Sequence, residues 1–470
     1  MTSNTSNFDK GLDAYNKGDF ATALKEWEPL AKQGFTKAQS HLGVMYVNGE
    51  GVTKDCKEAL RLFKIASEKG DAKAKNGLGV MYDEGTGVNQ DSKEAVKWFQ
   101  LAAEQGFAPA QTNLSMMYYY GNGVSQNYKK SAKLCRLAAE QGYAPALTDL
   151  GRLYKEGNGV SQDYKEALRL FRLGAKHEHE GAYMNLSEMY YDGEGVPQDL
   201  KKAAQWCKRA AKQGNVSAHL LLGLFYSQGG KGLSQDYKEA FKWFKFAAEK
   251  GKGAAQYFLG TMYEDGTGVN QDYKEAIKWY KLAAEKGIPI AQYSLGMMYE
   301  EGNGVPQDFQ VTGQLLFKLA AKQGNIAAQK HLGRMYDDGD GVPKDYQKAA
   351  QLFRLAAEQG DIEAQINIGD MYYYGDGVPL DYNEAFKWFR LSAEKGDSDA
   401  QYRLGCMYAN GYGVIEDNVF ALMWWYIASS NGNENTKEYI DDIEGLMTSS
   451  QIKEAQRLSK ECMKKDYKGC

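Results

Sequence analysis

Residues 146–175 read ALTDLGRLYKEGNGVSQDYKEALRLFRLGA, and versions of this unit fill most of the 470-residue chain. Each copy opens with an alanine, and these alanines are Ala38, Ala74, Ala110, Ala146, Ala182, Ala218, Ala255, Ala291, Ala328, Ala364 and Ala400. Their spacing is 36 residues, except for 37 residues in the copies that start at Ala218 and Ala291. A fixed period of this length predicts a solenoid, in which each unit packs mainly on its neighbours. We therefore expect one elongated array rather than several globular domains.

The first half of each unit predicts an amphipathic helix. In the copy that starts at Ala146, the residues Leu150, Leu153 and Tyr154 follow at i+4, i+7 and i+8. At 3.6 residues per turn these four side chains lie on one stripe of a helix. Gly157 comes next and suits the left-handed backbone conformation that ends a helix. We call this first helix of each unit helix A.

The second half predicts another helix, helix B, which begins after an aspartate. Asp163 and Glu166 have the three-residue spacing of an N-capping pair. The same pair recurs as Asp91 and Glu94, Asp236 and Glu239, Asp272 and Glu275, and Asp381 and Glu384. Large aromatic residues such as Phe171 then face small residues such as Ala175, as close packing of neighbouring backbones requires. The pattern predicts an all-α chain of helix-turn-helix units.

The two ends of the chain depart from the repeat. Residues 1–37 contain a shortened unit without the glycine-rich loop, which resembles a tetratricopeptide hairpin, and we interpret it as an N-terminal cap. Residues 38–436 hold the eleven repeats. Residues 437–470 abandon the pattern but keep apolar residues at helical spacing, and we interpret them as C-terminal capping helices.

Charge and composition limit the classes of partner that the chain is expected to bind. The chain has 57 Lys and Arg residues against 61 Asp and Glu residues, a formal net charge of -4. A nucleic-acid binder needs a basic face, so we expect no nucleic-acid partner. The first residues, MTSNTSNFDKG, are polar, and no run of about 18 apolar residues follows, so we expect neither a secretory signal nor a membrane span. A cytoplasmic protein is the expectation, with export without a cleavable signal as the alternative.

The six cysteines show neither a CxxC pair nor a spacing that repeats within units. They do not predict a disulfide framework. Cys135 and Cys207 occupy the position that Phe99 holds in its own unit, which predicts buried thiols. Cys462 and Cys470 lie in a lysine-bearing tail, where their reactivity is left open.

The pieces A-x-x-x-L-G-x-M-Y, G-x-G-V and D-Y-x-K/E-A-x-x-W-F-x-x-A-A-x-x-G together resemble the Sel-one-like repeat, a relative of the tetratricopeptide repeat. The resemblance covers residues 38 to about 432. It implies a right-handed superhelical α-solenoid of about 11 repeats, whose A helices line a concave groove that holds other proteins. It implies no catalytic residue. Some cysteine-rich relatives are described as β-lactam-binding, but their cysteines are paired within units and those of this chain are not.

Partner-binding residues are expected on the face of helix A that lies opposite the core and would line the concave groove. With the unit's alanine as position 1, the core takes positions 1, 5, 8 and 9, and the opposite face takes positions 3, 7 and 10. Tyrosine, methionine and arginine are typical of binding hot spots. The candidates at these positions are Met116, Tyr119, Arg152, Lys155, Met184, Glu188, Tyr191, Leu220, Leu224, Tyr257, Tyr293, Arg334, Tyr373 and Tyr402. The alternative is that curvature buries the position-3 side chains against the next A helix.

Other constellations predict no chemistry. The glycine-rich loops lack the lysine and hydroxyl residues of a phosphate-binding loop. Asp337, Asp338 and Asp340 lack the bidentate glutamate of a calcium loop, so a solvated turn is the better interpretation. His177 and His179 lack a third zinc ligand, and no nucleophile recurs beside a base.

We therefore expect no cofactor, no metal and no enzymatic activity. The predicted function is a scaffold or adaptor that binds a protein or peptide in its groove, with a small-molecule ligand disfavoured. Two alternatives stay open: a β-lactam-binding or other small-ligand protein with weak hydrolase activity, and an exported effector that engages a host protein.

Overall fold

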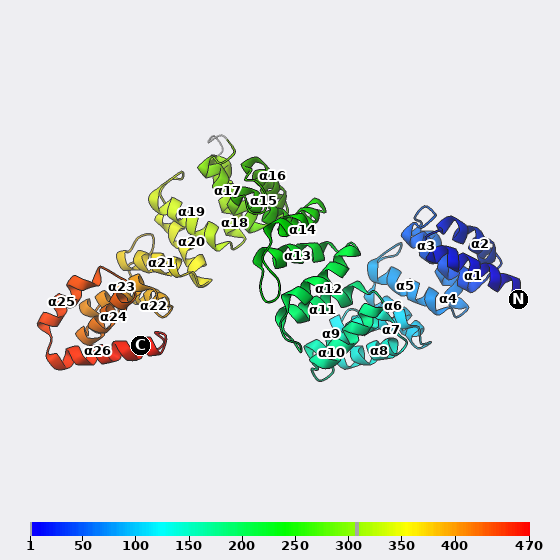
Figure 1. The fold of residues 1–470 in the computed structure, drawn as a ribbon, viewed down its shortest axis with the longest axis horizontal. Coiled ribbons are helices and arrows are strands. Elements are labelled where there is room, and N and C mark those ends of the chain that lie inside the picture. Colours follow the sequence, from blue (N-terminus) through cyan, green and yellow to red (C-terminus); the bar gives the residue numbers. More distant parts are fainter. Residues whose placement is uncertain (1, 306–309) are drawn as a thin grey trace. The chain divides into compact units, whose positions relative to one another are not determined.

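The computed structural model describes residues 2–305 and 310–470, and these residues form α-helices without a β-strand (Figure 1). The helices are α1 (Thr2–Asn16), α2 (Phe20–Lys32), α3 (Thr36–Asn48), α4 (Cys56–Glu68), α5 (Ala72–Glu84), α6 (Ser92–Ala103), α7 (Ala108–Tyr120), α8 (Tyr128–Glu140), α9 (Ala144–Glu156), α10 (Tyr164–Lys176), α11 (Glu180–Asp192), α12 (Leu200–Lys212), α13 (Val216–Gln228), α14 (Tyr237–Glu249), α15 (Gly253–Asp265), α16 (Tyr273–Glu285), α17 (Pro289–Glu301), α18 (Gln310–Lys322), α19 (Ile326–Asp338), α20 (Tyr346–Glu358), α21 (Ile362–Tyr374), α22 (Tyr382–Ala393), α23 (Ser398–Asn410), α24 (Asn418–Ser430), α25 (Thr436–Leu446) and α26 (Ser449–Lys464). The predicted all-α solenoid is confirmed.

The chain divides into two compact units, one that ends at Asp236 and one that begins at Tyr237. In each unit helices A and B of one repeat pack closely, and helix B then packs on helix A of the next repeat. Figure 1 shows this succession of hairpins along the colour gradient. Among the residues that the structure describes, no helix is long and apolar enough to cross a membrane.

Two glycines shape the loop between helices A and B of the repeat that starts at Ala146. Gly157 has a φ of 75°, and its N–H group donates to the carbonyl of Leu153, which ends helix α9 as predicted. Gly159 lies against the backbone of Tyr128, at the start of helix B in the preceding repeat, and a Cβ at this position would collide with the Tyr128 carbonyl. The glycines therefore let the loop of one repeat rest directly on the repeat before it.

Four of the five predicted aspartate caps are confirmed, but the glutamates act differently from a reciprocal capping pair. The Asp163 carboxylate accepts from the N–H groups of Lys165 and Glu166, and Asp91, Asp272 and Asp381 cap their helices in the same way. The N–H group of Asp163 already donates to the Tyr154 carbonyl at 2.9 Å. Glu166 consequently turns forward and pairs with Arg169 at 2.7 Å.

The motif glycine of helix A contacts the aromatic ring of helix B. A Cβ on Gly79 would lie 2.5 Å from the Phe99 ring, and Gly151 and Phe171 form the same contact. Two repeats have a serine in place of the motif glycine and a cysteine in place of the aromatic residue. Ser115 lies 2.9 Å from the buried thiol of Cys135, and in the other repeat Ser187 stands with Cys207. The predicted buried thiols are confirmed, and burial raises the pKa of Cys135 to about 12.

The glutamine after the unit's alanine has a structural role that the sequence reading missed. The buried Gln111 donates to the carbonyl of Ala103, at the end of the preceding helix B. Gln256, Gln329, Gln365 and Gln401 make the same bond eight residues back. This bond satisfies one of the carbonyls that the end of a helix leaves without an intrahelical partner.

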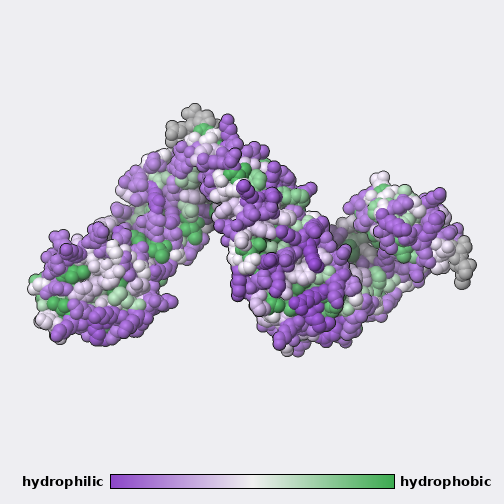
Figure 2. Space-filling model, in the orientation of Figure 1, coloured by the Kyte–Doolittle hydropathy of each residue, from purple (hydrophilic) through white to green (hydrophobic). Residues whose placement is uncertain are grey.

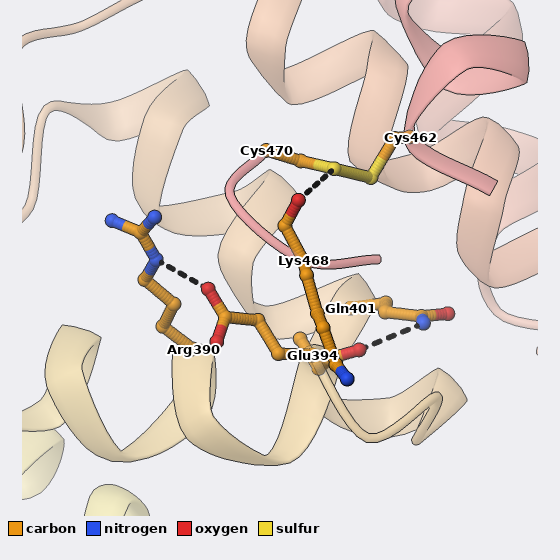
Figure 3. Close-up of a disulfide and its surroundings, with 7 residues drawn as sticks. Arg390, Glu394, Gln401, Cys462, Lys468 and Cys470 are labelled. Atoms are coloured by element: carbon orange, nitrogen blue, oxygen red, sulfur yellow. Dashed lines mark hydrogen bonds and ion pairs between the residues drawn. A yellow bond between two sulfur atoms is a disulfide. The ribbon is translucent and has the colours of Figure 1, made fainter. Parts of the chain in front are cut away.

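The C-terminal helices pack on the last repeat. Helices α25 and α26 both contact α24, and Tyr467 in the following tail reaches Asn431, to which its hydroxyl donates at 3.1 Å. Cys462 and Cys470 form a disulfide in this tail (Figure 3). The six cysteines were not expected to form a disulfide framework, and this pair, whose reactivity was left open, does form one bridge. The tail turns back after α26, through left-handed residues Asp466 and Tyr467, and the spacing of the two cysteines in the sequence carries no signal for this turn.

Candidate functional site

The predicted groove residues lie on A helices of both units. In the first unit they are Met116 and Tyr119 on α7, Arg152 and Lys155 on α9, Met184, Glu188 and Tyr191 on α11, and Leu220 and Leu224 on α13. In the second unit they are Tyr257 on α15, Tyr293 on α17, Arg334 on α19, Tyr373 on α21 and Tyr402 on α23. Each unit therefore has its own candidate surface.

Arg152 joins two neighbouring A helices of the first unit. Its guanidinium lies over the Tyr119 ring, 4.9 Å from the centroid, and 3.4 Å from the sulfur of Met116. The Asp149 carboxylate is 3.4 Å away, and burial raises its pKa although Arg152 opposes the shift. The Tyr119 hydroxyl donates to Glu156 at 2.7 Å. These contacts fix the ring and the cation while leaving both partly exposed.

Lys155 is engaged in ion pairs. Its ammonium lies 2.9 Å from the Glu188 carboxylate on α11 and 3.2 Å from Glu194 in the loop after α11. One ammonium and two carboxylates, from two neighbouring repeats, thus form one charge network with an excess of negative charge. Lys155 bridges repeats, and Glu188 carries the exposed carboxylate of the network.

A hollow of about 460 Å³ lies between α11 and α13. Its lining combines apolar and polar side chains: Met184, Asn185, Ser187, Glu188, Tyr191, Asp192, Leu221, Leu224, Phe225 and Gln228. The Tyr191 ring stacks on Phe225 with 5.3 Å between centroids. Four of the predicted groove residues line this hollow, whereas Leu220 does not, because α13 turns its neighbour Leu221 toward α11.

The tyrosines of the second unit are held by neighbouring rings. Tyr257 lies 5.8 Å from Tyr280 on α16, and Tyr293 lies 5.7 Å from Phe317 on α18. The Tyr402 ring contacts Tyr439 of α25 at 5.4 Å. Tyr373 packs among Tyr374, Tyr382 and Tyr412, and burial together with these rings raises its pKa to about 12. Arg334 forms an ion pair with Glu363 on α21.

Apolar side chains also line a second hollow of the first unit. On the face drawn in Figure 2, hydrophobic residues form separate patches within a hydrophilic surface. A second hollow, of about 280 Å³, lies on α3, α5 and the start of α7 and is lined by Val44, Val47 and Val80. These valines occupy positions 7 and 10 of their units, so the position count indicates them, but valine is not among the residue types that selected the other candidates.

The side chains that could ligate a metal ion are dispersed over the described part of the chain. Within residues 2–305 and 310–470, no group of three or more His, Cys, Asp or Glu side chains is placed to hold a metal ion. His179, from the only histidine pair, shares a 2.8 Å hydrogen bond with the Thr148 hydroxyl instead. Burial lowers the pKa of His179.

Comparisons with known proteins agree with this architecture. The family described as the Sel1 repeat matches residues 36–71, 72–107, 108–143, 144–179, 181–215, 216–252, 253–288, 289–325, 326–361, 362–397 and 398–433. A search of curated proteins found no match. One similar crystal structure is a protective antigen present in uropathogenic Escherichia coli strains displaying an SLR fold, with 35% identity over 94% of this chain and 96% of that chain and a TM-score of 0.64. Another is a Sel1 repeat protein from Oxalobacter formigenes, with 34% identity over 66% of this chain and 89% of that chain and a TM-score of 0.56.

Proposed function

Because the chain belongs to the Sel1 repeat family, whose solenoids commonly act as protein-interaction scaffolds, we propose that it binds a partner protein or peptide through the A helices of its first unit. One observation carries the proposal. The hollow between α11 and α13 is lined by Met184, Glu188, Tyr191 and Leu224, residues singled out as a binding surface by their position in the repeat.

The lining has the composition of a binding anchor. Tyrosine and other aromatic rings bury a large area at low cost in side-chain entropy, and methionine adapts to the shape of its partner. A hollow of about 460 Å³ accommodates a few side chains of a partner, which would be buried against Leu221 and Phe225. Glu188 and Asp192 at the same hollow favour a partner whose apolar anchor is followed by a basic side chain.

The test compares the A helices of the first unit with B helices of other repeats in the same unit. Full-length wild type and a Met184→Ser, Leu224→Ser variant are used to capture partners from a lysate, and bound proteins are identified by mass spectrometry. The control carries Leu101→Ser and Leu137→Ser, which remove leucines of helices α6 and α8 that are 44% and 41% exposed. We expect the first variant to lose the partner and the control to retain it. Loss in the control alone would place the partner on the B helices and refute the proposal.

A second candidate function is an exported protein that engages a host protein. It is favoured by the relative described as a protective antigen, which matches almost the full length of this chain. The test is fractionation of the source cells together with antibody labelling of intact cells. Detection only inside the cells would contradict this candidate and leave the scaffold proposal untouched.

A further inference from the structure

The second hollow of the first unit combines an apolar floor with charges at its two ends. The floor consists of Val44 and Val47 on α3, Val80 on α5 and the ring of Phe63. Gly77 uncovers this ring, since a Cβ on Gly77 would lie 2.7 Å from the Phe63 Cζ. Lys73 and Glu84 also line the hollow, near the beginning and the end of α5. Eleven residues of helix separate them, which is about 16 Å along the axis.

Lys73 has no ion-pair partner within the described chain. No carboxylate of those residues lies within 4.0 Å of its ammonium. The titratable groups that face it are His41 on α3, Glu50 in the loop after α3 and Asp71 at the start of α5. Burial lowers the pKa of Lys73 to about 8, although Asp71 and Glu50 oppose the shift. A partly buried cation without a counter-ion is stabilised by any ligand that supplies a carboxylate.

Polar groups between the two charges suit a peptide backbone. Asn48 and Asn76 line the same hollow. The side-chain carbonyl of Asn76 accepts from Asn113 at 3.0 Å, and within the described chain its NH₂ group has no recorded acceptor. At about 3.3 Å per residue, an extended peptide covers the 16 Å between Lys73 and Glu84 with about five residues.

We propose that this hollow binds the C-terminal segment of a partner polypeptide. The terminal carboxylate pairs with Lys73, a large apolar C-terminal side chain lies on Val44 and Val80, and a basic residue about four positions upstream approaches Glu84. Charge complementarity at both ends favours a peptide over a fatty acid, which would leave Glu84 and the asparagine amides without a role. The proposal stands independently of the function proposed for the α11–α13 hollow, because the two hollows lie on different helices.

The test uses two hexapeptide libraries of equal composition, one with free C-terminal carboxylates and one with C-terminal amides. Full-length protein is incubated with each library, and retained peptides are sequenced by mass spectrometry. We expect at least ten-fold more retention from the acid library, with Leu, Ile, Val, Phe or Met enriched at the last position and Lys or Arg enriched upstream. Equal retention from the two libraries, or retention of neither, would overturn the proposal.

Three variants separate the binding site from effects on folding. Lys73→Met removes the cation and should abolish the preference for acids, whereas Lys64→Met, on the exposed face of α4, should keep it. Lys73→Arg keeps the charge at all accessible pH values. Between pH 7 and pH 9 the wild type should lose retention of the acid library as Lys73 deprotonates, and Lys73→Arg should not. Retention of the acid library by Lys73→Met would refute the role of this side chain.

Discussion

Substitutions of Gly79 and Phe99 should be strongly coupled in their effects on stability. Another repeat of the chain has both residues replaced, by Ser115 and Cys135. Phe99→Cys leaves a cavity beside Gly79 and should destabilise the α5–α6 hairpin by about 2–4 kcal/mol, somewhat less than the 3–5 kcal/mol typical of Phe→Ala. Gly79→Ser places a side chain where the Phe99 ring now lies, 2.5 Å from the Cβ position, and should cost about 1–3 kcal/mol. The double variant reproduces the Ser115 and Cys135 pair of another repeat. The serine side chain fills part of the cavity that Phe99→Cys leaves, and the smaller cysteine removes the clash that Gly79→Ser creates.

We expect the double variant to be less destabilised than the sum of the single variants by about 2 kcal/mol. Hydrogen–deuterium exchange of the amides in α5 and α6 measures the free energy of local opening, which suits a solenoid better than one global unfolding transition. Phe171→Cys combined with Gly79→Ser serves as the control, because those residues belong to different repeats and should be additive. Additive effects for the Gly79 and Phe99 changes would refute the direct coupling.

Three further predictions follow from single features of the structure. Burial beside Phe8 and Trp27, together with the charge of Lys73, lowers the pKa of His41 to about 4. The free energy of unfolding should therefore fall by on the order of 1–3 kcal/mol as the pH is lowered from 6.5 to 4, because the unfolded state binds the proton more tightly. Hydrogen–deuterium exchange of the amides in α1–α3, measured against pH for the wild type and His41→Gln, checks this. Asp163→Ala should destabilise the start of α10 by about 1 kcal/mol, and exchange of the Lys165 and Glu166 amides should report it. Cys470→Ser should destabilise the tail after α26 by roughly 2 kcal/mol, because the disulfide closes a short loop, and protease cleavage after Lys468 should become faster than in the oxidised wild type.

Most of the fold could be predicted from sequence because the same constraints recur in every unit. The alanine, the motif glycine, the aromatic residue and the capping aspartate each have one local role, and repetition separates these roles from chance. The disulfide between Cys462 and Cys470 could not be predicted in this way. It depends on a single turn of the tail, which occurs once and has no periodic signal.

The candidate site could be predicted only in part for a related reason. Counting 100° per residue identifies the outer face of helix A but not what the neighbouring helix places against it. Tyr257 and Tyr293 lie at the same unit position as Met184, yet rings of the adjacent B helices pack against these two tyrosines. Leu221, one residue away from the predicted face, lines the hollow because α13 and α11 meet there.

The two hollows described on the first unit lie where a side chain next to the core is smaller than its counterparts in most other repeats. Ser187 lines the α11–α13 hollow, and its repeat has Cys207 where most repeats have an aromatic ring. Gly77 lines the other hollow, and the absence of a side chain there uncovers Phe63. A small side chain that touches the core is therefore a second guide to hollows in this chain, beside the positions that face away from the core.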